Sequence, residues 1–258
     1  MGIKYKVNRD FFKSWSPGMS YVLGFIAADG SLEDASYLRG KYLRICSSDI
    51  EILEKIKSAM NSEHKIVIIK PKEFLFRGKK YVSKEKYMLR IGSHEIYNDL
   101  LRLGITPRKS KTIIFPNIPI EFLTYFIRGY SDGDGCINVY NKKKRLSVTF
   151  TSGSKLFLEQ LSKIITFALG AKVHSVFRNS RAYQIKYSTK EAVLLLKYIY
   201  SDIIDKLYLE RKYKVFLGFF QSYPKWQEYD GVVPKRLREL SAKQLCTGSN
   251  PVHASNFA

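Results

Sequence analysis

Cysteine, histidine and acidic residues are all scarce in this chain of 258 residues. The three cysteines, Cys46, Cys136 and Cys246, lie far apart and form no C-x-x-C pair, and there are four histidines. This spacing argues against a disulfide framework and against a Cys/His zinc site. Unpaired thiols fit a protein of a reducing compartment.

Long hydrophobic runs are also missing. No apolar stretch approaches the roughly 18 residues that a membrane span needs. The opening segment, "MGIKYKVNRDFFKSW", lacks the apolar core of a secretory signal. The chain begins Met-Gly, but Lys6 stands where N-myristoylation requires Ser or Thr. We therefore expect an intracellular protein of the cytoplasm, the nucleoid or an organelle matrix, with no membrane partner.

Positive charge is abundant instead. The chain has 44 basic and 23 acidic residues, which gives a formal net charge of +21. Such an excess predicts a polyanionic partner, either nucleic acid or an acidic membrane surface. The sequence shows no basic amphipathic helix, so nucleic acid is the favoured partner. Hydrophobic residues make up 45% of the chain, enough for a packed core.

The chain contains two copies of one pattern. "YVLGFIAADGSL" (from Tyr21) and "YFIRGYSDGDGCI" (from Tyr125) align so that Asp29 matches Asp134, 105 residues later. Each is followed by the same succession of strand, polar break and helix, and "PRKSK" (from Pro107) matches "ERKYK" (from Glu210). This predicts two α/β units in one chain, residues 1–116 and 117–222, followed by an extension, 223–258, without a counterpart.

Each unit is expected to open with a helix that carries the acidic motif. Prolines at 17 and 119 are start signals. The glycines after each aspartate, Gly30 and Gly135, are stop signals that tolerate a left-handed backbone. Further helices are expected at about 49–60, 95–103, 154–169 and 190–200.

The strands between these helices alternate apolar and polar residues. Leu146, Val148 and Phe150 face one side, while Arg145, Ser147, Thr149 and Thr151 face the other. This period of two predicts antiparallel sheets with one face under the helices and one exposed. The exposed face is basic, and the connecting loops add "RGKKY" (from Arg77), "NKKKR" (from Asn141) and "RNSR" (from Arg178), as expected for a DNA groove binder. The candidate DNA contacts are Arg44, Arg77, Lys79, Lys80, Arg90, Asn138, Lys143, Arg145, Thr149, Arg178, Arg181, Gln184 and Lys186.

The two motif helices carry small residues at helical spacing, Gly24, Ala27 and Ala28 in the first and Gly129, Ser131 and Gly133 in the second. Small residues let two helices approach closely. If these helices pair, two aspartates meet where both helix dipoles are negative, an arrangement that needs a cation. Oxygen ligands favour Mg²⁺, which supports phosphodiester hydrolysis.

The simpler interpretation is that Asp29 and Asp134 merely precede a glycine turn. A helix C-terminus disfavours aspartate, and both copies have it, so we favour the metal site. Asp132 is matched by Ala27, so the pairing does not require it, and a local turn or a supporting role remain equally open.

The segments "VLGFIAADG" and "IRGYSDGDG" resemble the two motifs of the LAGLIDADG homing endonucleases in their single-chain form, and the resemblance covers roughly residues 15 to 220. It implies a monomer of two pseudo-symmetric αββαββα units (α+β class) whose antiparallel sheets form a DNA-binding saddle. It implies an intron-encoded enzyme that makes a double-strand break with 3′ overhangs in a long target.

The resemblance also implies the roles of particular residues. Asp29 and Asp134 would share two or three Mg²⁺ ions, helped by the backbone carbonyls of Ala28 and Gly133. Lys109 and Lys212, beside Arg108 and Arg211, would act near the scissile phosphates. The glutamine that the family often has at the end of the second strand is replaced by Ser47 or Ser48 and by Thr151 or Ser154, which leaves the water-positioning role unassigned.

Two alternatives remain open on this fold. A splicing maturase would bind its host intron RNA, and a non-cleaving regulator would bind DNA alone. Retention of both acids favours cleavage. An intein is disfavoured because the first motif follows Met1 closely.

Overall fold

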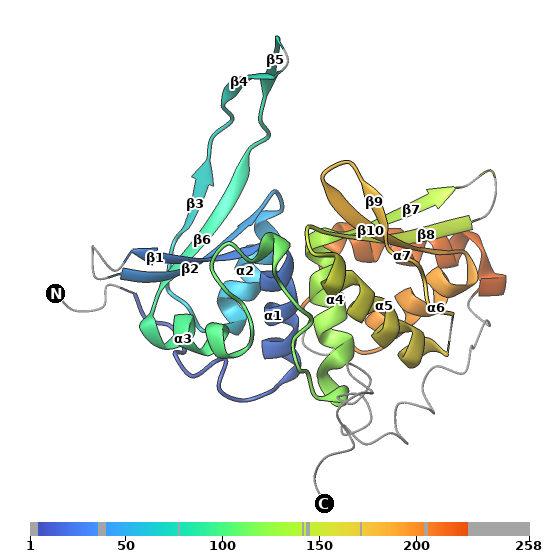
Figure 1. Ribbon diagram of the computed structural model, residues 1–258, viewed down its shortest axis with the longest axis horizontal. Coiled ribbons are helices and arrows are strands. Elements are labelled where there is room, and N and C mark those ends of the chain that lie inside the picture. The colour runs from blue at the N-terminus through green and yellow to red at the C-terminus, as the bar shows by residue number, and fades with distance from the viewer. Residues whose placement is uncertain are drawn as a thin grey trace, which may run out of the picture.

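The computed structural model describes residues 5–35, 40–76, 78–140, 142, 145–170, 172–203 and 206–226. These form two similar halves, each with a four-stranded antiparallel sheet above its helices (Figure 1). The first half has the order α1 (Pro17–Asp29), β1 (Gly30–Ala35), β2 (Gly40–Ser47), α2 (Ile50–Ala59), β3 (Ile66–Ile69), β6 (Lys86–Gly92) and α3 (His94–Arg102). A separate hairpin, β4 (Glu73–Phe76) and β5 (Lys79–Val82), is inserted between β3 and β6.

The second half repeats this order. It contains α4 (Leu123–Asp134), β7 (Gly135–Tyr140), β8 (Arg145–Ser152), α5 (Lys155–Leu169), β9 (Phe177–Asn179), β10 (Ala182–Ser188) and α6 (Lys190–Tyr200). Helix α7 (Glu210–Ser222) follows, and short 3-10 turns lie at Lys109–Lys111, Ile120–Phe122 and Pro224–Trp226. The mixed fold class and its αββαββα order are confirmed.

The two sheets also share their topology. The strand orders are β1-β2-β6-β3 and β7-β8-β10-β9. Gly30 pairs with Ile45 in the first sheet, and Gly135 pairs with Phe150 in the second, so both partners shift by the same 105 residues. The repeat in the sequence is therefore a repeat of strand register.

Helix boundaries follow the sequence signals closely. The helix expected at 190–200 spans Lys190–Tyr200, and the one expected at 154–169 begins one residue later, capped by Ser154 through its side chain. Helix α1 is capped by Ser16 with Pro17 at its first position. Helix α4 begins later than expected, because Pro119 leads into a 3-10 turn before Leu123.

The expectation that Gly30 and Gly135 are left-handed caps is wrong. Their φ angles are −89° and −87°, in the extended region. Glycine is required there by space instead. A Cβ on Gly30 would lie 2.6 Å from Cγ2 of Ile26, and one on Gly135 would lie 2.3 Å from the carbonyl oxygen of Ser131. Each strand thus starts directly against the last turn of its helix.

The apolar face of each sheet packs on helices as expected. Leu43, Ile45, Leu146, Val148 and Phe150 are all buried. Ser147, expected on the exposed face, is also buried, because it lies in the central strand β8 between Asn138 and Ser188. Within the described part of the chain, no helix is both long and apolar enough to cross a membrane. Cys46 and Cys136 are free thiols, and Cys246 lies outside the described residues.

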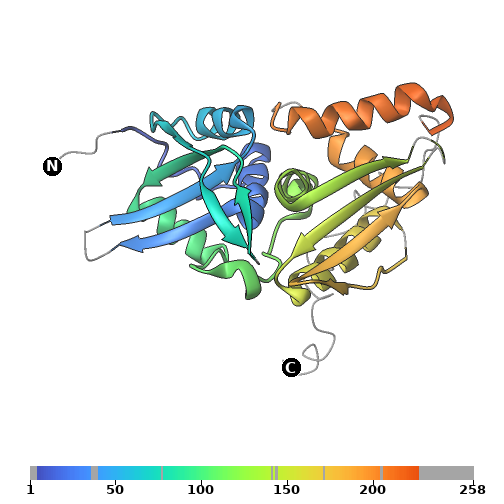
Figure 2. The same ribbon diagram turned by 90° about the horizontal axis from the view of Figure 1, so that it is seen from above.

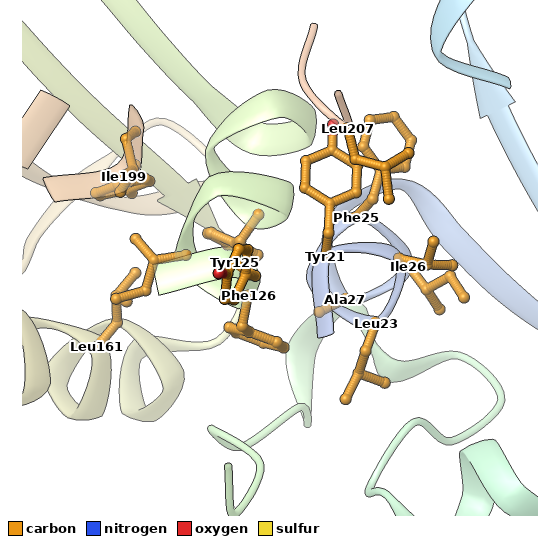
Figure 3. Packing of buried hydrophobic residues seen from close by; sticks show 14 of the residues in the cluster. Tyr21, Leu23, Phe25, Ile26, Ala27, Tyr125, Phe126, Leu161, Ile199 and Leu207 are labelled. Carbon is orange, nitrogen blue, oxygen red and sulfur yellow. The ribbon is translucent and has the colours of Figure 1, made fainter. Parts of the chain in front are cut away.

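Helices α1 and α4 join the halves at backbone contact and lie side by side between the two sheets (Figure 2). A Cβ on Gly24 would lie 2.1 Å from the carbonyl oxygen of Phe126, and one on Gly129 would lie 2.0 Å from that of Tyr21. These two contacts are related by the repeat, since Phe126 is 105 residues after Tyr21. Figure 3 shows Tyr21, Phe25 and Phe126 gathered about this crossing.

Polar contacts add to this interface. The Ser20 hydroxyl donates to the carbonyl of Phe122 at 2.8 Å. Arg128 of α4 is fully buried and donates to the carbonyls of Ile199 and Asp202 at the end of α6. The equivalent position in α1 is Leu23, so this anchor belongs to the second half alone.

We predict that Gly24→Ala destabilises the fold by about 2–3 kcal/mol, because the added methyl group forces two backbones apart. For a chain of this size, that lowers the melting temperature by roughly 6 °C. Gly218→Ala is the matched control: it lies within α7, and a Cβ there meets nothing within 4 Å. The control should gain about 1 kcal/mol of helix propensity. Equal thermal unfolding curves for the two variants would contradict the close helix contact.

Candidate metal centre and nucleic-acid interface

The two motif aspartates end the two helices that are in contact. Asp29 is the last residue of α1, and Asp134 is the last residue of α4. A Cβ on Gly133 would lie 2.4 Å from the Cβ of Ala28 and 3.3 Å from Oδ2 of Asp29. The carboxylate of Asp29 therefore lies against the final turn of α4, and the structure brings both acids to one end of the interface.

The surroundings raise the pKa of both carboxyl groups. Burial raises the pKa of Asp134 to about 6, with the negative charge of Asp29 as the second cause. Burial also raises the pKa of Asp29 from its ordinary value, against the opposing charges of Lys212, Lys109 and Lys86. Two acids that resist ionisation side by side form a site where a cation lowers the free energy.

Lys109 lies beside this pair. Its side chain is buried, and its ammonium group donates to the carbonyl of Ala28 at 3.5 Å. Burial lowers the pKa of Lys109, while the charges of Asp134 and Asp29 raise it. The ammonium group thus contacts the same carbonyl that the family resemblance implies as a metal ligand, and both lie at the negative end of α1.

Lys212 matches Lys109 in the repeat but is bound differently. Its ammonium group donates to three carbonyls, those of Ser131 at 2.6 Å, Asp132 at 2.8 Å and Gly135 at 2.6 Å. An ammonium group has three hydrogens, so these bonds use its whole donor capacity. Lys212 therefore caps the C-terminus of α4 and makes none of these bonds to the carbonyl of Gly133.

The neighbouring arginines lie elsewhere. Nε of Arg211 donates to both carboxylate oxygens of Asp49 at 3.1 Å, which ties α7 to the start of α2 in the other half. Arg108 is exposed and has a left-handed backbone, with φ of 58°.

Asp132 supports the site through hydrogen bonds to its buried side chain. Its side chain is buried, and Oδ2 accepts hydrogen bonds from the Tyr21 hydroxyl at 2.7 Å and from the backbone N–H of Leu209 at 2.8 Å. These bonds join α1, α4 and the residue before α7. Asp132 thus supports the placement of Lys212 and is more than a local turn residue.

Lys86 is a site neighbour that the sequence interpretation missed. It begins β6. Burial raises the pKa of both Asp29 and Cys46, and the nearby positive charge of Lys86 opposes that rise in each case. The repeat gave no signal for Lys86, because the aligned position in the second half is Ala182.

The donors fit a hard divalent cation. Two carboxylates and the Ala28 carbonyl are oxygen ligands, which suit Mg²⁺ rather than zinc. Across the described residues, no group of three or more His, Cys, Asp or Glu side chains forms a metal cluster. A cation here would therefore depend on water or on phosphate oxygens for its remaining ligands.

Most of the candidate DNA contacts share the exposed faces of the sheets. Arg44 pairs directly with Arg90 in the first sheet, and Thr149 pairs with Lys186 in the second. Gln184 donates to the Thr151 hydroxyl at 3.1 Å and accepts from Asn179 at 2.9 Å. The same exposed face carries Asn138 and Arg145, which lie in β7 and β8.

Of the remaining candidates, one lies on the helix side of its sheet, two lie outside the described residues, and one lies in a turn. Arg178 pairs with Tyr183, so it lies on the helix side of the edge strand β9, although it is exposed. Gln184 pairs with Phe177, and side chains alternate between the two faces along a strand. Arg178 therefore lies on the opposite face of the sheet from Gln184. Arg77 and Lys143 lie outside the described residues. Arg181 lies exposed in the turn between β9 and β10.

Lys79 and Lys80 lie on the β4–β5 hairpin, which projects beyond the rest of the first half (Figure 1). In this hairpin Phe74 stacks on Tyr81 with ring centroids 5.8 Å apart. Several of its apolar side chains are exposed: Phe74, Leu75, Phe76, Tyr81 and Val82. In the second half, β9 is joined to β10 by a short turn at residues 180–181, so the described residues form no such projection between these two strands.

Comparisons with known proteins agree with this fold. Residues 121–208 match the family model of the LAGLIDADG-like domain. The structure is similar to the homing endonuclease I-WcaI bound to its DNA recognition sequence, with 17% identity and a TM-score of 0.55, over 80% of this chain and 91% of that one. It is also similar to the LAGLIDADG homing endonuclease I-GzeII in complex with its DNA target, with 15% identity and a TM-score of 0.50, over 92% and 99% of the two chains.

A curated relative is the probable translation initiation factor IF-2 of Methanocaldococcus jannaschii. It is 28% identical over 174 residues, which cover 65% of this chain and 13% of that protein. The chain thus spans a small part of the length of this relative. At these levels of identity, the structural matches show the fold.

We predict that Asp134→Asn stabilises the metal-free protein at neutral pH. The folded state holds this carboxyl group at a pKa of about 6, against an ordinary value of 3.8, so ionisation above pH 6 costs folded-state stability. The gain should grow as pH rises from about 4 to 6 and reach about 2 kcal/mol. Urea unfolding in EDTA across this range measures it. A gain that is the same at pH 4 and pH 8 would contradict the raised pKa of Asp134.

The two lysines should separate in stability. Lys212→Met removes three charged hydrogen bonds and leaves buried carbonyls unpaired, so we expect a loss of about 3 kcal/mol. Lys109→Met removes one long bond at a site of similar burial, and we expect a loss of about 1 kcal/mol or less. Thermal unfolding of the two variants provides the comparison, and equal losses would show that Lys212 is not the cap of α4.

Proposed function

We propose that this chain, which carries a LAGLIDADG-like domain and has the fold of the single-chain LAGLIDADG homing endonucleases, is a site-specific DNA endonuclease. The single observation that carries the proposal is the meeting of Asp29 and Asp134 at the end of two helices packed at backbone contact. Both sheets lie on one side of the molecule (Figure 1), and their exposed faces carry the basic residues that DNA binding requires.

In this proposal the two acids serve opposite strands. The repeat relates Asp29 to Asp134, as a two-fold axis relates the phosphates of the two strands of a duplex. Bound divalent cations, Mg²⁺ in our proposal, would supply an activated water and stabilise the charge on the leaving oxygen. Asp29, Asp134 and the carbonyls of Ala28 and Gly133 would hold them.

The remaining residues position and balance charge. The ammonium group of Lys109 lies where it can stabilise the charge that develops on a phosphate, since its only hydrogen bond in the described structure is the long one to Ala28. Lys212 keeps the end of α4, and so Asp134, in place through its three carbonyl bonds. Catalytic roles therefore fall on the aspartates and Lys109, and a positioning role falls on Lys212.

The finer points of the proposal come from the family resemblance. We propose a monomer of two units, residues 1–116 and 117–222, with the extension 223–258 outside them. We propose cleavage of both strands to leave 3′ overhangs, in the service of intron homing. The partner would be double-stranded DNA, met in a reducing intracellular compartment.

We predict that Asp29→Asn and Asp134→Asn each lower double-strand cleavage by at least about 1,000-fold and leave binding within about threefold. The acids act on the cations and not on the base edges. The measurement is cleavage of a DNA target enriched from a randomised duplex pool, with Mg²⁺ or with EDTA, beside a filter-binding assay. Asp10→Asn is the control, because Asp10 is exposed and pairs only locally with Lys13.

Two results would overturn this assignment. Specific binding without cleavage in Mg²⁺ or Mn²⁺ would make the protein a DNA-binding regulator. Promotion of intron splicing with no DNA cleavage would make it an RNA maturase.

A further inference from the structure

An acidic residue lies in the middle of the basic face of the first sheet. Glu33 of β1 contacts two arginines at once: its Oε1 forms an ion pair with Nη1 of Arg44 at 2.9 Å, and its Oε2 accepts a hydrogen bond from Nε of Arg90 at 2.9 Å. Arg44 and Arg90 are direct neighbours on β2 and β6, and all three side chains lie on the exposed face. Both arginines are among the candidate DNA contacts, so Glu33 holds two of them.

Glu33, Arg44 and Arg90 together form what we call the Glu33 array, and further residues support it. The guanidinium carbon of Arg90 lies 3.6 Å from the centroid of the Tyr42 ring. That ring lies over two glycines, since a Cβ on Gly40 would lie 2.4 Å from it and one on Gly92 would lie 3.1 Å from it. The absence of two side chains thus lets the ring lie across the sheet and form a platform for Arg90.

The two arginines differ in which nitrogen donors remain available to a ligand. Glu33 takes Nε of Arg90. In the described structure Nη1 and Nη2 of Arg90 make no hydrogen bond, so both groups remain available to donate to a ligand. Nη1 of Arg44 forms an ion pair with Glu33, and Nε of Arg44 donates to the Ser31 hydroxyl at 3.2 Å. Arg44 therefore retains Nη2 as its least engaged group.

Stability does not account for this arrangement. The side chains of Arg44 and Arg90 are 43% and 41% exposed, and ion pairs of that exposure contribute little to folding. A carboxylate here also weakens the attraction of the face for phosphate. Its benefit lies in fixing the plane and direction of the guanidinium groups.

We propose that Glu33 is a specificity-positioning residue that holds Arg90 for bidentate recognition of a guanine in the major groove. The paired Nη groups of Arg90 match the O6 and N7 acceptors of guanine. The Glu33 carboxylate fixes the direction in which Arg90 approaches the base. Because the carboxylate repels phosphate, it also disfavours binding of Arg90 to the DNA backbone. This inference rests on the proposed DNA-binding function.

The second sheet cannot repeat this recognition. Asn138 and Thr149 occupy the places of Glu33 and Arg44 at the offset of 105, and Lys186, which pairs with Thr149, takes the place of Arg90. Ser147 replaces the Tyr42 platform. A guanine read in this way should therefore appear in only one half of the target.

The test is selection of bound duplexes from a randomised pool, in EDTA, by the full chain and its variants. The wild type should enrich a guanine at one position of one half-site by tenfold or more. Arg90→Ala should abolish that preference. Glu33→Ala should lower it at least fivefold while affinity for random duplex stays equal or rises, because a negative charge is removed from a basic face.

Asp34→Asn is the matched control. Asp34 is the next residue, lies on the opposite side of the strand and pairs with Lys41 at 2.9 Å. It should leave the selected sequence unchanged. Melting temperatures of all variants show whether folding is retained.

The outcomes are distinguishable. If the wild type enriches no sequence, the proposed DNA-binding function fails. If it enriches a guanine that Glu33→Ala leaves untouched, or if Glu33→Ala weakens recognition equally at every position together with total affinity, the positioning role fails while DNA binding remains.

Discussion

The contact between α1 and α4 is the constraint on which the rest of the structure depends. Gly24 and Gly129 allow the two backbones to meet, and only that approach brings both helix ends to one place. The cost is electrostatic. Two carboxylates share the negative ends of two helices, and burial raises the pKa of both. The interface thus places two carboxylates that repel each other within a molecule that is otherwise strongly basic.

The backbone of the molecule is nearly symmetric, but its side chains are not. The two sheets share strand order and register. Yet Lys212 is bound by three carbonyls, whereas Lys109 has one long contact. The Glu33 array and the β4–β5 hairpin belong to the first half, and buried Arg128 belongs to the second. Such differences suit a protein whose two halves face different sequences along one duplex.

Much of this could be predicted from the sequence. The repeat of Asp29 at Asp134 gave the offset, and period-two alternation gave the buried faces of the strands. The repeat and the alternation are both patterns along the chain, so they can be recognised in one sequence without coordinates. The order of helices and strands followed, because each helix has its own start signal, such as Ser16 before Pro17 or Ser154 before α5.

The failures have a common physical cause. The conformations of Gly30 and Gly135 depend on how closely a strand follows its helix, which no sequence signal reports. The face of Arg178 depends on the register of a short edge strand. Lys86 and Glu33 matter through neighbours on other strands, and neither has a matching partner in the repeat. Contacts across the sheet, unlike periodicity along it, need coordinates.

The reciprocal packing of α1 and α4 has a consequence for ancestry and recombination. Because Gly24 meets Phe126 as Gly129 meets Tyr21, the interface is almost self-complementary, and a single unit of this design has the backbone shape to pair with its own copy. The bond from Tyr21 to Asp132 breaks that equivalence, since Phe126 and Ala27 stand at the reciprocal positions. Exchanging halves between relatives would therefore preserve the steric fit of the two glycines and lose the hydrogen bond from Tyr21 to Asp132.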